Sequence, residues 1–246
     1  MDMQAADPIF IHGIMPRSGT NYLWDLLCTH PACAPARLPV REDLFLEHSD
    51  HLADFVEAVR SAWNPSWGDF SDELINRLYA GLGDGLTSFL WIDRDRRLLT
   101  KSPSVSNVDR FFRFFPGGRL VILIRDGRAI TQSCMSTFGW EFERGARTWA
   151  SAAAEIRRFM GSQSNSMGTY LLVRYEDLLD DLEGSMRRIL GYLGLDPKLF
   201  DFDRADLRPE ALGDGDDADC GRIAIRGGRG PLDPAPDRGP PGTDGR

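Results

Sequence analysis

Residues 8–27, with the sequence PIFIHGIMPRSGTNYLWDLL, bring an apolar run, a small polar turn and a helix-like segment into direct succession. The β-branched run at 8–14 predicts a short strand, and apolar residues at 22–23 and 26–27 recur at helical spacing. A strand that enters a helix through a tight turn is the repeating unit of parallel sheets covered by helices. This segment, more than any other, directs the chain to the α/β class.

The same alternation continues along the chain. Strands are expected within 97–103, 119–128 and 170–179, and the strongly β-branched run at 119–128 suits a central buried strand. Helices are expected at 50–63, 71–82, 106–115 and 141–161, after residue 128, and as one continuous helix from about 175 to 193, whereas 38–48 has the pattern of a loop. The pattern predicts an α/β fold with a P-loop-like central parallel sheet of about four to five strands, flanked by helices and carrying a helical insertion at 50–82.

The length of 246 residues and the 42% hydrophobic content fit one α/β domain, which we place at residues 1–207. Residues 208–246 differ, because 28 of these 39 residues are Gly, Pro, Asp or Arg and none is aromatic. Such a tail cannot bury enough apolar surface to offset the entropy of ordering, and we expect it to be disordered. The same bias is also what GC-rich DNA encodes in a shifted frame, so an aberrant tail is the alternative.

The net charge of −8 argues against a nucleic-acid partner, because a polyanion requires a clustered positive surface. Four cysteines without a CxxC pair fit a reduced compartment and make a structural zinc site improbable. The start of the chain has no basic and apolar leader, and no apolar run is long enough for a membrane span. These features lead us to expect a soluble, cytoplasmic protein.

The turn after the first strand has the properties of an anion site. Backbone N–H groups at a helix start and the helix dipole both stabilise negative charge, and Gly19 permits a close approach. The neighbouring side chains of Arg17, Ser18, Thr20 and Asn21 add donors. In the alternative, Ser18 merely caps the helix and Arg17 is solvated. A P-loop kinase would require a lysine between Gly19 and Thr20, which the sequence lacks.

A second set of anion ligands follows the run at 119–124. Arg125 would end that strand, and Ser133 lies about two turns into the next helix. Because the carboxyl ends of parallel strands line the ligand crevice, Arg125 should share the crevice with the Arg17 turn. Two anion sites in one crevice suggest a nucleotide with two separated charged groups. In the alternative, Arg125 only pairs with Asp126 or another acid.

Three segments together resemble the sulfotransferases that use 3′-phosphoadenosine 5′-phosphosulfate. PRSGTNYL (16–23) is similar to their 5′-phosphosulfate loop, LIRDGRAITQSCMS (123–136) to their 3′-phosphate motif, and LLVRYEDLLDD (171–181) to their Tyr-Glu-Asp segment. The resemblance covers about residues 8–195 in the expected order. It is closer to the tyrosylprotein and membrane-type branch, and to bacterial relatives, than to the cytosolic phenol and steroid branch.

The resemblance implies a role for each matching residue. The 5′-phosphosulfate would lie on Arg17, Ser18, Gly19, Thr20 and Asn21, the 3′-phosphate on Arg125 and Ser133, and the adenine near Tyr175. No metal is implied. Arg226, within IAIRGGRG (223–230), is a degenerate match to the C-terminal loop that closes over the nucleotide.

The resemblance also implies the catalytic groups. Lys101, one of only two lysines in the chain, matches the lysine that stabilises the leaving oxygen. The histidine base of the cytosolic branch is absent after it, and Glu42 lies where the membrane-type branch has a glutamate base. Rivals for this role are Asp43, Glu47 and His48. In the alternative, Glu42 is a solvated loop acid paired with Arg41, and His12 is expected to be a packed core residue.

The predicted function is transfer of a sulfuryl group from this donor to a hydroxyl, or with less support an amine, of a small-molecule, sugar, lipid or peptide acceptor. A catalytically impaired nucleotide-binding or scaffold protein of the same fold is the alternative. A P-loop-type nucleotide kinase is the third reading, and the missing lysine disfavours it.

Overall fold

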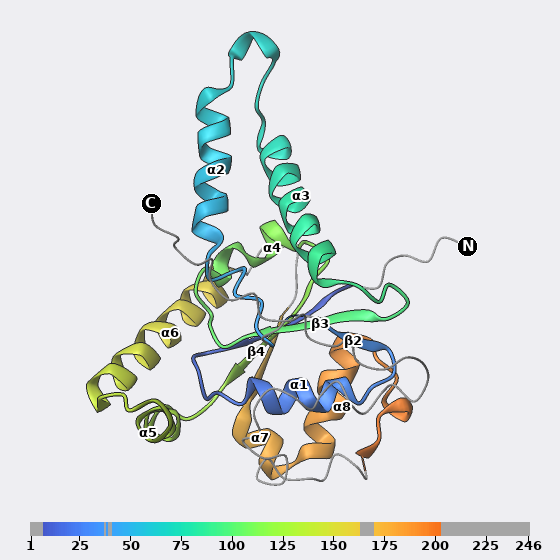
Figure 1. Cartoon of the computed structure of the whole chain (residues 1–246), viewed down its shortest axis with the longest axis vertical. Helices are drawn as coiled ribbons and strands as arrows, with labels where there is room; N and C mark the ends of the chain where they lie inside the picture. Colours follow the sequence, from blue (N-terminus) through green and yellow to red (C-terminus); the bar gives the residue numbers. More distant parts are fainter. Residues whose placement is uncertain (1–6, 37, 39–40, 163–169, 203–246) are drawn as a thin grey trace, which may run out of the picture. The chain divides into compact units, whose positions relative to one another are not determined.

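Five parallel strands form a single sheet with the order β2-β3-β1-β4-β5 in the computed structural model (Figure 1). The strands are β1 (Ile9–Gly13), β2 (Cys33–Pro35), β3 (Arg97–Ser102), β4 (Arg119–Ile124) and β5 (Tyr170–Arg174). The structure describes residues 7–36, 38, 41–162 and 170–202, and all of them fall in one compact unit, Met1–Asp214. The predicted parallel sheet is confirmed, with the β-branched run at 119–124 inside it.

The helices are α1 (Thr20–Cys28), α2 (Ser49–Ala62), α3 (Asp72–Leu90), α4 (Phe111–Phe114), α5 (Gly127–Phe138), α6 (Phe142–Ser162), α7 (Tyr175–Asp180) and α8 (Leu182–Leu193). Short 3₁₀ turns lie at Pro65–Trp67, Val108–Arg110 and Pro197–Leu199. Within the described part of the chain, no helix has the length and apolar character needed to cross a bilayer. The predicted tail at 208–246 lies outside the described residues.

The sheet is buried on both faces, as its continuous apolar runs require. On one face, Phe10 of β1 and Leu120 and Ile122 of β4 join the core formed with α4, α5 and α6. Helices α1, α7 and α8 gather together in Figure 1, where α1 packs against β1 and β3 and α7 packs against β5. The chain therefore has three layers, and the carboxyl ends of β1, β3 and β4 share one edge of the sheet.

The predicted insertion is a hairpin of α2 and α3, which pack side by side (Figure 1). Its second helix begins as expected, since Ser71 Oγ accepts a hydrogen bond of 3.4 Å from the Leu74 N–H. The predicted end at residue 82 is wrong, because α3 continues to Leu90. Gly83 is retained within the helix because a side chain there would collide with the Phe114 carbonyl oxygen. The glycine serves the contact between α3 and α4 and does not end the helix.

Two further expectations are corrected by the structure, and one strand was missed. The expected helix at 106–115 is only a 3₁₀ turn and the four-residue α4, preceded by Asn107 at φ 61°. The expected single helix after Tyr175 is interrupted at Asp181, whose φ of −143° ends α7 and whose carboxylate caps α8 through the Gly184 N–H at 2.9 Å. The edge strand β2 was not predicted. It has three residues, too few for a period to appear in the sequence.

Candidate functional site

The loop between β1 and α1 turns tightly by means of two residues with positive φ, Arg17 at 72° and Gly19 at 96°. A side chain at Gly19 would collide with the ring of Tyr175, so glycine is required there for both conformation and space. Gly13 is equally constrained, because a side chain there would meet Ser18 Oγ. The loop is therefore packed between β1 and α7 in one defined shape.

This loop leaves polar groups available to a ligand. Ser18 is fully buried, and its Oγ has no hydrogen-bond partner among the described residues. The position that precedes α1 is Gly19, which supplies no side-chain cap, so the alternative in which Ser18 caps the helix is wrong. Unsatisfied buried polar groups are costly unless a ligand or water completes them. Thr20 is buried and Asn21 exposed at the first turn of α1, whose N–H groups favour an anion.

Arg17, Ser133 and Arg125 meet beside this loop. The Arg17 Nε donates a 3.0 Å hydrogen bond to Ser133 Oγ, and the Arg125 Nη1 donates one of the same length to the Arg17 carbonyl oxygen. The structure thus brings together the two sets of residues that were predicted to bind anions. The alternative partner for Arg125 is engaged elsewhere, since Asp126 pairs with Arg128 at 2.9 Å and caps α5, which holds the pKa of Asp126 well below its usual range.

The ring of Tyr175 packs against Arg125. The Arg125 Cζ lies 4.5 Å from the centroid of the Tyr175 ring, a cation–π distance. The next residue, Glu176, accepts a 2.7 Å hydrogen bond from the Asp126 N–H. The Tyr-Glu-Asp segment therefore fixes the arginine and the start of α5. That Tyr175 also lies near an adenine stays a prediction.

Lys101 and Glu42 form an ion pair at the neighbouring strand end. Lys101 is on β3 with 1% of its surface exposed, and its Nζ lies 3.2 Å from Glu42 Oε1. The backbones of the two residues also form an isolated parallel bridge. The Glu42 side chain keeps 37% exposure. One carboxylate therefore reaches both a buried ammonium group and solvent, which suits a proton acceptor for an incoming group.

Asp25 of α1 was not predicted as part of the site. It accepts a 3.2 Å hydrogen bond from Arg41. Burial raises the pKa of Asp25, while the positive charges of Arg41 and Lys101 oppose the shift. Its place one helical turn after Asn21, on the helix that starts at the loop, was the signal available in the sequence.

Asp43, the residue after Glu42, is buried, and both of its carboxylate oxygens accept hydrogen bonds. Its Oδ2 accepts from Thr100 Oγ1 at 2.6 Å and its Oδ1 from the Phe45 N–H at 3.0 Å. Burial raises the pKa of Asp43, against the opposing effects of His12 and these hydrogen bonds. Because Asp43 is buried and both of its oxygens already accept hydrogen bonds, it is a weaker candidate for the base than Glu42.

His12 is buried on β1, as expected of a packed core residue. Its Nδ1 lies 2.8 Å from the Ser104 carbonyl oxygen, and because a carbonyl only accepts, that nitrogen carries the hydrogen. Burial lowers the pKa of His12, and the charge of Asp43 opposes this effect. His12 and Asp43 thus form an electrostatically linked pair beneath the site.

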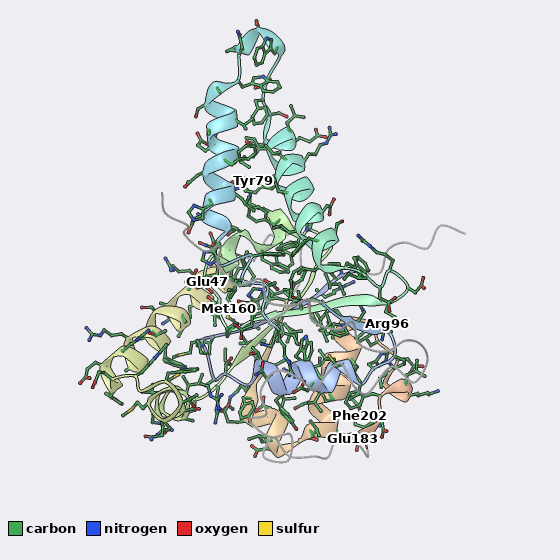
Figure 2. All side chains as sticks on the ribbon, in the orientation of Figure 1. Glu47, Tyr79, Arg96, Met160, Glu183 and Phe202 are labelled. Carbon is green, nitrogen blue, oxygen red and sulfur yellow. The ribbon has the colours of Figure 1, made fainter. Side chains whose placement is uncertain are left out.

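The remaining rivals, Glu47 and His48, are exposed residues directly before α2. Figure 2 shows Glu47 at the base of that helix. Its carbonyl oxygen accepts from Asn107 Nδ2 at 3.2 Å, which ties the turn to the 3₁₀ segment. The predicted ligand Arg226 lies outside the described residues.

A shallow hollow of about 350 Å³ lies on the side of α5 and α6. Its lining is mainly apolar and includes Gly127, Phe142 and Trp149. None of the predicted ligands or catalytic residues lines it. The candidate site is therefore the edge of the sheet and not this hollow. Among the residues with described positions, no cluster of three or more His, Cys, Asp or Glu could hold a metal ion.

The part of the chain that carries the sheet and the candidate site matches known proteins. The model of the Sulfotransferase family matches residues 8–199. The chain is 29% identical over 208 residues to protein-tyrosine sulfotransferase A of Caenorhabditis elegans, covering 76% of this chain and 50% of that protein. A Caenorhabditis briggsae relative is 22% identical over 207 residues, and the chain spans 65% of its length.

Solved structures show the same fold. A sulfotransferase from Alicyclobacillus acidocaldarius matches with a TM-score of 0.54 and 16% identity, over 83% of this chain and 87% of that one. The sulfotransferase domain of the Synechococcus olefin synthase matches with a TM-score of 0.50 and 23% identity, over 85% and 79%. The solved structures share the helix-covered parallel sheet of this chain, and the family model covers most of the chain, residues 8–199. The chain belongs to the sulfotransferase family.

Proposed function

We propose that this chain transfers a sulfuryl group from 3′-phosphoadenosine 5′-phosphosulfate to a hydroxyl acceptor. The observation that carries the proposal is the meeting of Arg17, Ser133 and Arg125 next to the buried hydroxyl of Ser18, which has no partner among the described residues. This arrangement offers two arginines and a helix start to one ligand. A nucleotide with phosphate groups at both its 3′ and 5′ positions fits such a pair of anion sites.

The donor substrate would bind through its 5′-phosphosulfate to the loop at 17–21 and through its 3′-phosphate to Arg125 and Ser133. Arg17 belongs to the first set and contacts Ser133 of the second, so the two sets are continuous. Binding energy spent at both ends of the nucleotide would hold its sulfuryl group in one orientation.

In the transfer, the acceptor oxygen forms a bond to sulfur while the bond between sulfur and the bridging phosphate oxygen breaks. Glu42 takes the proton of the acceptor hydroxyl. Lys101 stabilises the negative charge that develops on the leaving oxygen, and the products are a sulfate ester and adenosine 3′,5′-bisphosphate. Support for these roles comes from the 3.2 Å ion pair and from the solvent access that Glu42 retains.

A tyrosine hydroxyl in a peptide is the first acceptor to test, because a protein-tyrosine sulfotransferase is among the curated relatives. Sugars, lipids, phenols and amines complete the panel. Donor labelled in the sulfuryl group should give labelled product with at least one class. Glu42→Gln should lower turnover about a hundredfold, whereas the exposed neighbour variant Glu47→Gln should match the parent.

The possible results distinguish the proposed function from its two alternatives. Tight binding of adenosine 3′,5′-bisphosphate with no transfer to any acceptor would favour a nucleotide-binding or scaffold protein. Preference for ATP over the bisphosphate would favour a kinase and overturn the proposal. Full turnover in Glu42→Gln would remove Glu42 from its role as the base.

A further inference from the structure

Three consecutive residues in the segment before α2 are each held by a different partner. Arg41 donates to Asp25 of α1, Glu42 pairs with the side chain of Lys101, and Asp43 accepts from Thr100. The Asp43 N–H also donates to the Lys101 carbonyl oxygen at 3.1 Å. Asp43 therefore contacts β3 through both its backbone and its side chain, at Lys101 and at the adjacent Thr100.

The backbone next to Asp43 is strained. Leu44 has a φ of 53°, in the left-handed region that residues other than glycine seldom adopt. The Asp43 Oδ1 reaches across this residue to accept the Phe45 N–H at 3.0 Å. A strained residue persists only where surrounding contacts hold it, and this hydrogen bond is the contact that spans it.

We propose that Asp43 is a positioning residue, whose carboxylate fixes the 41–45 segment on β3 so that Glu42 stays opposite Lys101. The inference rests on the proposed function, since it assigns Asp43 to the positioning of the proposed base and ammonium group. Asp43 itself touches neither substrate nor reacting atoms in this role.

The strength of this attachment follows from its surroundings. Asp43 has 7% of its surface exposed and Thr100 has 1%, so water competes poorly for their 2.6 Å hydrogen bond. Loss of the carboxylate would leave the Thr100 hydroxyl and the Phe45 amide without this acceptor and would release the strain at Leu44. The segment would then shift, and small displacements of a catalytic group lower the rate steeply.

The test compares Asp43→Ala with Asp43→Asn. The asparagine amide can accept from Phe45 and donate to the Thr100 hydroxyl, so it keeps both contacts without the charge. With Asp43→Ala, we expect kcat to fall by about tenfold to a hundredfold, the Kd for adenosine 3′,5′-bisphosphate to stay within about threefold, and hydrogen exchange to rise in peptides covering 41–46. Asp43→Asn should restore most of kcat and the slow exchange, and Asp54→Ala, on the exposed face of α2, should change neither.

A second pair of variants tests the same contact from the other side. Thr100→Val removes the donor and should reproduce the fall in kcat and the faster exchange, whereas Thr100→Ser should rescue both. This pair decides the matter if Asp43→Ala fails to fold. Unchanged exchange and kcat in Thr100→Val would overturn the proposal, as would an Asp43→Asn variant with slow exchange but the low kcat of the alanine variant.

Failure of the proposed function gives a different result. If Glu42→Gln kept full turnover, Glu42 would not be the base, yet faster exchange at 41–46 in Asp43→Ala and its reversal in Asp43→Asn would still show the attachment. Slow exchange in all variants would reject the attachment even if Glu42 proved to be the base.

Discussion

The Arg17 Nε donates to Ser133 Oγ across 116 positions of the chain, at a distance of 3.0 Å. This contact joins the loop after β1 to the helix after β4. The carbonyl oxygen of the same Arg17 accepts from Arg125, so one residue contacts both proposed 3′-phosphate ligands. We therefore expect substitution of Arg17, Ser133 or Arg125 to change the affinity for the donor nucleotide.

Removal of Arg125 should weaken donor binding without loss of the fold. We expect Arg125→Ala to reduce the affinity for adenosine 3′,5′-bisphosphate by about 1.5–3 kcal/mol, the range for a hydrogen bond to a charged group. Arg17→Lys, which keeps the charge but loses the Nε donor, should cost less. Titration calorimetry measures both. The control is Arg128→Ala, because the Arg128 side chain is 93% exposed, and equal affinities for Arg125→Ala and the parent would contradict the site.

Gly19 should be far less replaceable than another glycine with positive φ. Gly19→Ala meets two penalties, about 1 kcal/mol for the backbone conformation and a collision with the Tyr175 ring. Gly139 has φ 65° and open space around it, so Gly139→Ala should show only the first penalty. Urea unfolding gives the two free energies, and bisphosphate binding should weaken in Gly19→Ala alone. Equal losses of stability would show that Tyr175 moves away freely.

Substitution of Lys101 should lower turnover more than it lowers the affinity for the donor. Lys101→Met keeps the length of the buried side chain but removes its charge, and we expect turnover to fall about a hundredfold or more. Donor affinity should fall much less. The only other lysine, Lys198, is exposed on the last 3₁₀ turn, and Lys198→Met is the natural control. A purely structural role for Lys101 would lower stability and leave kcat per folded molecule unchanged.

Alkaline pH should destabilise the chain through Cys33. Burial raises the pKa of this thiol from 9.0 to about 11, with Arg97 and Arg96 opposing. Between these values the unfolded chain loses the proton while the folded chain keeps it, so stability falls as pH rises, by about 2–3 kcal/mol in total. Urea unfolding of the parent and Cys33→Ala between pH 8 and about 11 should show a shallower decline in the variant. Parallel curves would contradict this prediction.

The role of Arg226 stays open to a direct test. If residues 208–246 are an unpacked tail, a chain ending at Leu207 should melt within a few degrees of the parent and bind the bisphosphate equally well. Limited proteolysis should then remove the tail with or without nucleotide. Protection of 223–230 by nucleotide, with an affinity loss of about 1–3 kcal/mol on truncation, would instead identify Arg226 as a donor ligand.

Periodicity predicted the elements whose burial follows a regular repeat. β1 and β4 contain nearly continuous apolar runs, IFI and LVILI, because both faces of the sheet are covered, and these runs can be recognised in the sequence alone. Tertiary contacts decided the other cases. The amphipathic pattern predicted a helix only to residue 82, but α3 continues through Gly83, where a side chain would collide with the Phe114 carbonyl oxygen.

In the candidate site, too, some residues could be predicted from the sequence and others could not. Spacing and motif resemblance gave Arg17, Arg125 and Ser133, which the structure brings together. The role proposed here for Asp43 depends on a side-chain contact between separate elements, the hydrogen bond from Thr100, which lies 57 positions away in the chain. No local pattern records such a contact. From the sequence, Asp43 could therefore be proposed only as a rival of Glu42 for the role of the base.

The strand order has a consequence for how the protein is made. The sheet places β1 between β3 and β4, so both neighbours of β1 are present only after three further strands, β2, β3 and β4, have been synthesised. On the ribosome, that loop emerges more than a hundred residues before Ser133. If the donor nucleotide binds as proposed, a nascent chain cannot hold it at both ends until α5 has left the exit tunnel. Added bisphosphate should therefore stabilise only states in which β4 has docked beside β1.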